Sequence, residues 1–211
     1  MTSFARYYKN RKLVNVSMTD MGNLISDKIN QKIIAEHVYE RLYNRFLKIF
    51  DFSSSRLNEY EKEGKTEFRN VFNEEYKNGF LIMTSCSLLI ETFSSFLLGQ
   101  NKTPRGKSDG MFNTVFEYAE SKNNELKQFK NKLFYSNIRC GLLHQGETYG
   151  KFKITRKGLN LIEDETINAI LFLNHLKSLL QTYQIDLAEG RWDSKEWDAC
   201  RLKIRHIIIN S

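Results

Sequence analysis

FLIMTSCSLLIETFSSFLL, residues 80–98, is the most hydrophobic stretch of this 211-residue chain, and it decides the fold class. It is long enough to cross a lipid bilayer, but Glu91 lies near its centre together with six serine and threonine residues. A carboxylate in the middle of a membrane costs roughly 2.5–3.5 kcal/mol. The stretch therefore predicts the buried central helix of a helical protein, with no membrane span.

Amphipathic patterns on both sides of this stretch predict further helices. Apolar residues from Ile25 to Ile49 recur three to five positions apart, as one core-facing helical stripe requires. One proline and 11 glycines leave few points at which helices are interrupted, although Gly99 is placed to end the central helix. The expected helices cover residues 20–50, 56–65, 68–98, 111–122, 124–143 and 163–184, with a last helix capped by Asp193 that ends at 207–209.

A short region after the helix expected at 124–143 alternates polar and apolar residues. This region, Lys151-Phe-Lys-Ile-Thr155, predicts a short strand or an edge hairpin with Gly158–Ile162. Because the β region is small, we expect an all-α fold, a helical bundle with one short β insertion. The expected organisation is a basic N-terminal segment at 1–19, the bundle at 20–190 and a C-terminal helix at 191–211 packed on the bundle.

Composition limits the classes of function. The hydrophobic content of 41% fits a packed globular protein. A net charge of +7 favours an anionic partner, and RNA is one candidate. The three cysteines lie far apart with no metal-ligand spacing, so we expect neither a metal nor a cofactor.

The N-terminus is basic and aromatic, with no apolar run behind it. It therefore lacks the pattern of a secretory signal, and we expect a cytoplasmic protein. Tyr7, Tyr8, Lys9 and Arg11 combine stacking rings with positive charge, as proteins that bind single strands do. A disordered or partner-packed terminus is the simpler expectation.

Arg139-Cys-Gly-Leu-Leu-His144 places an arginine and a histidine five residues apart at the end of a predicted helix. Arginine can neutralise a phosphate, and histidine can move a proton near neutral pH. The two together suffice, in principle, to cut RNA without a metal. A second pair, Arg201 and His206, has the same spacing, but it lies on a strongly basic terminal helix and indicates a solvated face.

The residues alone leave a structural reading of the first pair open. His144 would then cap the helix C-terminus, and Arg139 would form a salt bridge in the core. An ideal helix places positions i and i+5 about 140° apart and roughly 7.5 Å along the axis. Convergence would depend on the length of the arginine and on Gly141 and Gly146, which loosen the helix end. Glu91 needs a partner if it is buried, and Arg139 is the first candidate, which would make Glu91 an orienting residue. A capping or hydroxyl-bonded role for Glu91 is equally open.

With the glutamine, glycine and glutamate that follow, this segment resembles the R-x4-6-H motif of the HEPN superfamily. Arg139 and His144 match the two defining positions, and the likeness covers residues 68–184. The family often has asparagine directly after the arginine, where this chain has Cys140, a weak hydrogen-bonding group. The resemblance implies a HEPN-like helical bundle and a metal-independent endoribonuclease of toxin–antitoxin, phage-defence or RNA-processing settings, commonly a homodimer.

The resemblance also implies a chemical role for each of the two motif residues. The RNA 2′-hydroxyl would attack the adjacent phosphodiester, with His144 as general base or acid and Arg139 stabilising charge on the phosphoryl oxygens. The products would carry a 2′,3′-cyclic phosphate and a 5′-hydroxyl. The candidates for orienting or supporting roles are Glu91, Cys140 and Glu147. The candidates for RNA contacts, which are otherwise residues of a solvated loop at 100–110, are Lys102, Arg105 and Lys107.

Two other classes of function remain open. One is a catalytically inactive HEPN-like module that binds or scaffolds a protein, nucleotide or RNA partner, which Cys140 favours. The other is a helical RNA-binding adaptor that uses its basic surface without chemistry. The intact pair of Arg139 and His144 favours the nuclease, with RNA, a second copy of the chain and an antitoxin or regulatory protein as its partners.

Overall fold

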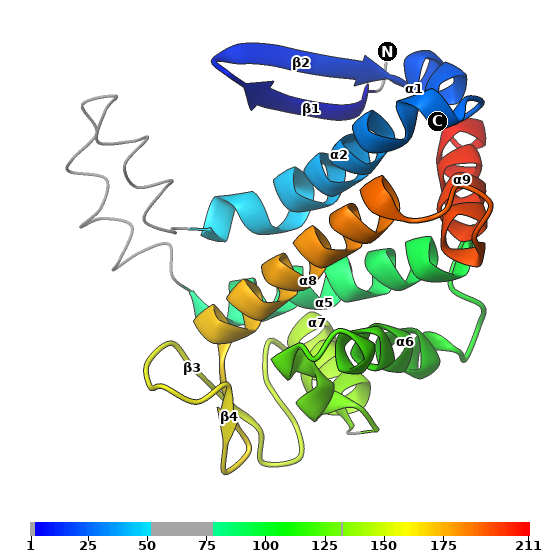
Figure 1. Ribbon diagram of the computed structural model, residues 1–211. Helices are drawn as coiled ribbons and strands as arrows, with labels where there is room; N and C mark the ends of the chain where they lie inside the picture. Colours follow the sequence, from blue (N-terminus) through cyan, green and yellow to red (C-terminus); the bar gives the residue numbers. More distant parts are fainter. Residues whose placement is uncertain (1–2, 52–77, 132) are drawn as a thin grey trace.

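The fold is built around one apolar helix. The computed structural model describes residues 3–51, 78–131 and 133–211. At its centre, α5 (Gly79–Leu98) packs against α6 (Ser108–Ser121), α8 (Ala169–Glu189) and α9 (Lys195–Ile209). A further helix, α2 (Gln31–Leu42), packs on α8, so the helices form successive layers across the molecule (Figure 1).

The central helix is buried, as the sequence predicted. Among the described helices, only α5 is long and apolar enough to cross a membrane, with a mean hydropathy of 1.7 over a window that is 56% buried in the fold. Its side chains Ile82, Phe93 and Phe96 are fully enclosed. Gly99 ends the helix in the left-handed conformation, as predicted, with φ of 66°.

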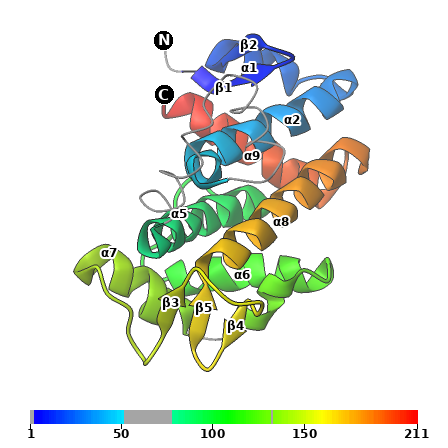
Figure 2. The same ribbon diagram turned by 90° about the vertical axis from the view of Figure 1, so that its left-hand side faces the viewer.

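Two small sheets make the fold mostly helical α+β, which corrects the all-α prediction. The first is an antiparallel hairpin of β1 (Ser3–Lys9) and β2 (Lys12–Ser17). The second contains β3 (Lys153–Thr155), β4 (Ile162–Glu163) and β5 (Thr166–Asn168) in the order β3-β5-β4. Figure 2 shows the two sheets at opposite ends of the molecule.

The N-terminal hairpin replaces the expected disordered or partner-packed segment. Its two-residue turn uses Asn10 and Arg11, both with positive φ, which matches the twist of the flanking strands. Phe4 and Tyr7 are buried against the helices, whereas Tyr8 on the opposite face is 68% exposed. Sequence analysis missed this hairpin because Asn-Arg lacks the glycine that usually marks such a turn.

The second sheet corrects a predicted pairing. The strand expected at 151–155 is present as β3, but it pairs in parallel with β5, through Ile154 and Ile167 among others. The hairpin is formed instead by β4 and β5, which turn at Asp164 and Glu165, both with positive φ. Helix α8 therefore begins later than predicted, where Asn168 accepts hydrogen bonds from the first backbone amides of the helix.

The long helix predicted at 20–50 is divided. It consists of α1 (Met18–Leu24), a 3-10 turn at Lys28–Asn30, α2, and then a π-helical turn at Tyr43–Leu47. Asp27 interrupts the pattern because its side chain accepts a hydrogen bond from the amide of Ile29, which starts a new turn. The helix predicted at 56–65 and the first part of the one predicted at 68–98 lie outside the described residues.

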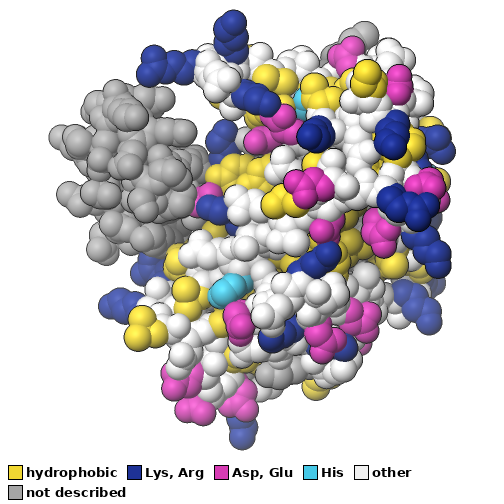
Figure 3. Space-filling model, viewed as in Figure 1, with side chains coloured by type: hydrophobic (Ala, Val, Ile, Leu, Met, Phe, Trp, Pro, Cys, Tyr) yellow, Lys and Arg dark blue, Asp and Glu magenta, His cyan; other side chains and the backbone are white. Residues whose placement is uncertain are grey.

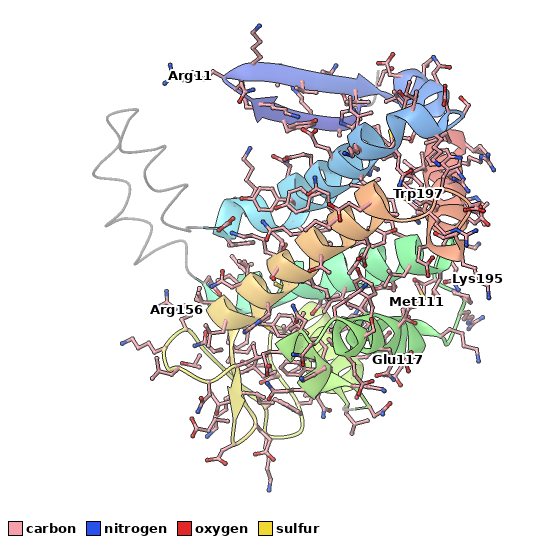
Figure 4. All side chains as sticks on the ribbon, in the orientation of Figure 1. Arg11, Met111, Glu117, Arg156, Lys195 and Trp197 are labelled. Carbon is pink, nitrogen blue, oxygen red and sulfur yellow. The ribbon has the colours of Figure 1, made fainter. Side chains whose placement is uncertain are left out.

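The C-terminal helix is capped by a different residue from the one predicted. Ser194 accepts the hydrogen bond from the amide of Trp197, whereas Asp193 forms an ion pair with Arg191. Trp197 is fully buried, and its indole Nε1 donates to the carbonyl of Leu187 on α8 at 2.9 Å (Figure 4). Side chains of α9 and of the hairpin belong to the same hydrophobic core as α5.

Replacement of Gly99 should destabilise the protein more than replacement of Gly106. Both glycines have positive φ, so alanine costs about 1 kcal/mol at either position. At Gly99 the new methyl also meets Cα of Ala199 at 3.0 Å, whereas no atom lies within 4 Å at Gly106. The crowding should cost a further 1–3 kcal/mol or so. Urea denaturation of the two variants measures the difference, and equal losses would contradict the close packing of α5 on α9.

Stability should fall when the pH drops below about 6.5 because of His37. Burial lowers the pKa of His37, which contacts the Tyr7 hydroxyl at 3.0 Å. Above about pH 6.5 the imidazole is neutral in both the folded and the unfolded protein. On acidification the unfolded chain takes up the proton first, which favours unfolding. Denaturation of wild type and His37→Gln is measured between roughly pH 5 and 8, where histidine titrates. The free energy of unfolding should fall less on acidification in the variant than in wild type, and an identical fall in both proteins would refute this role of His37.

Candidate active site

An ion pair joins the central helix to the predicted motif. Nη2 of Arg139 lies 3.2 Å from Oε2 of Glu91, and the two side chains are only 18% and 21% exposed. The predicted pairing of these residues is therefore confirmed. Because the pair is largely shielded from water, it fixes the guanidinium relative to α5 more firmly than a surface ion pair would.

The same carboxylate also holds the basic loop. Oε1 of Glu91 accepts a hydrogen bond from Oγ1 of Thr103 at 3.2 Å. Thr103 lies in the loop between α5 and α6, whose cations are exposed and have no ion-pair partner among the residues that the structure describes. The loop that carries the candidate RNA contacts is thus anchored beside Arg139. The three exposed cations of this loop are Lys102, Arg105 and Lys107.

Arg139 keeps part of its hydrogen-bonding capacity. Its guanidinium carbon lies 5.3 Å from the centre of the Tyr135 ring, at a distance typical of a cation–π contact. Its Nε is buried and has no hydrogen-bond partner in the described part of the chain. Glu91 accepts one hydrogen bond from Arg139 and does not form a bidentate pair with it, so the guanidinium retains donors for a further anion.

The helix that carries Arg139 is not the regular helix predicted at 124–143. It consists of a 3-10 segment at Glu125–Phe129, a π-helical turn at Tyr135–Cys140, and α7 (Gly141–Gln145). The wider π turn, which is frequent at functional sites, changes the angle between positions five residues apart. The π turn ends at Cys140, so Arg139 lies in the π turn whereas His144 lies in the regular helix that follows.

Aromatic packing sets the start of this π turn. The ring of Phe134 stacks on Phe172 of α8, with 5.3 Å between the ring centres and 13° between the planes. Phe129 meets Phe134 edge-on at 5.3 Å. These contacts attach the motif segment to α8, and Glu91 attaches it to α5.

His144 lies at the surface in the last turn of α7. No described residue forms a hydrogen bond with its imidazole, so the structure gives it no capping contact with the helix carbonyls. Gly146 ends the helix with φ of 69°, as predicted. Arg139 therefore forms the internal salt bridge that the structural alternative predicted for it. His144, in contrast, remains accessible, and no hydrogen bond joins the two side chains.

The chain crosses closely over the motif helix directly after it ends. A methyl group on Gly141 would collide with the backbone carbonyl of Glu147, so only glycine fits here. The Glu147 side chain is exposed, and Cys140 is partly buried. Neither side chain has a hydrogen bond to the rest of the described chain, and the structure assigns neither of them an orienting contact.

The solvated face predicted for the second arginine and histidine pair is wrong for Arg201, because its side chain is only 12% exposed. Arg201 donates to the Trp192 carbonyl at 2.8 Å and lies over the Trp192 ring at 4.5 Å. It also pairs with Asp198. Sequence analysis did not find Thr103 and Tyr135 at the first site, because their roles depend on contacts across the fold.

The arrangement is suited to binding an anion and moving a proton. Over the described ranges, no group of three or more histidine, cysteine or acidic residues is placed to hold a metal ion. Comparison of the chain with protein-family models, with curated proteins and with solved structures found no match.

The coupling between Glu91 and Arg139 should be measurable in stability. Glu91→Gln and Arg139→Gln should each lower the free energy of unfolding by roughly 1–3 kcal/mol, because each leaves a shielded charge unpaired. The double variant should lose about 0.5–3 kcal/mol less than the sum. Glu147→Gln, which removes an exposed carboxylate from the same region, is the control and should have little effect. Strict additivity in denaturant titrations would show that the ion pair contributes nothing.

Proposed function

We propose that this protein is a metal-independent endoribonuclease of HEPN type that acts as a homodimer. The observation that carries the proposal is the double contact of Glu91, which holds Arg139 and, through Thr103, the basic loop. Glu91 thereby brings the basic loop, whose three cations have no ion-pair partner among the described residues, beside an arginine with free donors. An accessible histidine follows that arginine five residues later in the chain. RNA supplies the phosphates that such a group of residues recognises.

The geometry supports a division of roles between the two motif residues. Arg139 binds the phosphoryl oxygens through its remaining donors, while Glu91 and the Tyr135 ring keep the guanidinium oriented. His144 takes the proton of the 2′-hydroxyl as its oxygen forms a bond to phosphorus. The bond from phosphorus to the 5′ oxygen then breaks, which leaves a cyclic phosphate and a 5′-hydroxyl.

The proton balance of this reaction favours two copies of the chain. The departing 5′ oxygen needs a proton from a general acid at the same time as the 2′-hydroxyl loses one. One motif offers a single histidine, so a partner copy would supply the second. Leu143, beside His144, and Tyr149 are exposed apolar side chains available for such a contact.

A second candidate function is an inactive binding module of the same class. The observation that favours it is the ion pair itself, because Glu91 already neutralises much of the charge that Arg139 would offer a phosphate. In this alternative the motif supports the fold, and a protein, nucleotide or RNA partner binds elsewhere. A cytoplasmic role in toxin–antitoxin systems or phage defence, with an antitoxin as regulator, is consistent with either candidate.

Cleavage of a mixed-sequence single-stranded RNA in EDTA tests the nuclease proposal. Wild type should cut and leave cyclic phosphate ends, whereas His144→Ala and Arg139→Ala should lose about 10²-fold or more in rate. His206→Ala, taken from the pair of equal spacing, is the matched control and should keep full activity. DNA of the same sequence should not be cut, because it lacks the 2′-hydroxyl.

Other outcomes separate the alternatives. Cleavage that requires a divalent metal, or that survives in His144→Ala, would refute this mechanism. If neither wild type nor variant cuts RNA, and Arg139→Ala mainly lowers stability, the binding module becomes the better description.

A further inference from the structure

A cavity at the base of the hairpin is lined by three arginines. It has a volume of about 300 Å³ and lies between β1 and the C-terminal part of α2. Its charged lining residues are Arg6 from β1 and Glu40, Arg41 and Arg45 from α2 and the turn that follows it. The charges in the lining therefore sum to two positive units, because one carboxylate faces three guanidinium groups.

Arg41 is the unusual member of this group. It is only 9% exposed, donates from Nη1 to the carbonyl of Phe4, and lies over the Phe4 ring at 4.7 Å. In the part of the chain that the structure describes, no carboxylate forms an ion pair with it. A buried cation without a counter-charge is costly. Burial, together with the charge of Arg45, lowers the pKa of Arg41 to about 10, so the group remains charged at neutral pH.

The opposite side of Arg41 adds more positive charge. A second cavity of about 220 Å³ is lined there by Arg41 and by Lys203 and His206 of α9, with no acidic residue. Nζ of Lys203 donates to the backbone carbonyl of Asn101 at 3.0 Å. Burial and the nearby Arg41 lower the pKa of Lys203. Cationic side chains of β1, of the turn after α2 and of α9 thus line the two cavities together with Arg41.

The one carboxylate of the first cavity does little to offset this charge. Glu40 accepts a hydrogen bond from Nδ2 of Asn44 at 2.6 Å and does not pair with any of the three arginines. Burial raises the pKa of Glu40, which makes its negative charge harder to maintain. The arginines are therefore left without a compensating anion from the described chain.

We propose that the cavity between β1 and α2 binds a terminal phosphate group, with Arg6, Arg41 and Arg45 as its ligands. A phosphate monoester carries up to two negative charges, which match the two excess positive charges of the lining. The planar guanidinium fork suits phosphate oxygens. Arg6 and Arg45 are exposed at this cavity and can be reached by a ligand, whereas Arg41 lies deeper.

The surroundings favour the approach of an anion. Residues 3–17 contain Arg6, Lys9, Arg11 and Lys12 and no carboxylate. Figure 3 shows lysine and arginine side chains around the hairpin end of the molecule, and Figure 4 shows Arg11 pointing outward from its tip. Such a field raises the local concentration of anionic ligands.

The proposed phosphate site lies away from the motif helix, although Asn101 of the basic loop lines the second cavity beside Arg41. The hairpin and α2 lie at the end of the molecule away from α7, as both ribbon views show (Figures 1 and 2). The inference therefore does not depend on RNA cleavage. The phosphate can belong to a free nucleotide or to the 5′ end of a nucleic acid, and a cavity of about 300 Å³ is at the small end of ligand sites.

Calorimetric titration of the full chain tests the proposal with defined probes. AMP should bind and adenosine should not, and Arg45→Gln and Arg6→Gln should each weaken AMP binding by about tenfold. These two residues are chosen because they are exposed, so their substitution should leave the fold intact. Arg205→Gln, which removes an exposed arginine of α9 outside the cavity, is the control and should bind AMP as wild type does.

A second pair of probes identifies the source of the phosphate. A 2′-O-methyl hexanucleotide, which lacks the hydroxyl needed for cleavage, is compared with and without a 5′-phosphate. Tighter binding of the phosphorylated hexamer than of AMP assigns the site to nucleic-acid ends, and the reverse order assigns it to free nucleotides. If the 5′-phosphate makes no difference to the hexamer while AMP binds, the site is assigned to free nucleotides. The proposal is overturned if AMP does not bind, if adenosine binds equally well, or if Arg45→Gln and Arg6→Gln leave the affinity for AMP unchanged.

Discussion

A carboxylate inside an apolar helix must find a partner, and Glu91 finds two. Its oxygens accept from Arg139 and from Thr103, so one side chain of α5 connects the motif helix and the basic loop. Without these partners the burial of Glu91 would oppose the packing of α5. The position of the candidate site is thus a consequence of satisfying one charge in the core.

Aromatic and glycine contacts complete this arrangement. Phe134 stacks on Phe172, which fixes where the π turn begins, and Gly141 allows the following chain to pass close to α7. Arg139 is consequently held inward on one side while His144 stays at the surface. The two motif residues thus differ in environment, because Arg139 lies in the π turn with an ion-pair partner whereas His144 lies exposed in α7.

Part of the positive charge of the chain lies in two neighbouring regions, since Asn101 of the basic loop and Arg41 line one cavity. One is the loop tethered by Thr103 beside the motif, and the other surrounds the buried Arg41 below the hairpin. Each combines accessible cations with an arginine whose position the fold fixes. Such a distribution suits a polyanion or a phosphorylated ligand better than a uniformly basic surface does, because fixed donors add geometric selectivity to long-range attraction.

The sequence by itself determined the features that depend on near neighbours in the chain. Hydrophobic content and period predicted that α5 is buried, and Gly99 and Gly146 marked helix ends. For the contact between Glu91 and Arg139, which are 48 positions apart, the sequence offered only a first candidate beside an equally open capping or hydroxyl-bonded role. Only the tertiary structure decided the N-terminal hairpin, the parallel pairing of β3 with β5 and the irregular motif helix. The same holds for the cavity at Arg41, because contacts between distant segments decide pairing partners and burial, which local residue patterns do not encode.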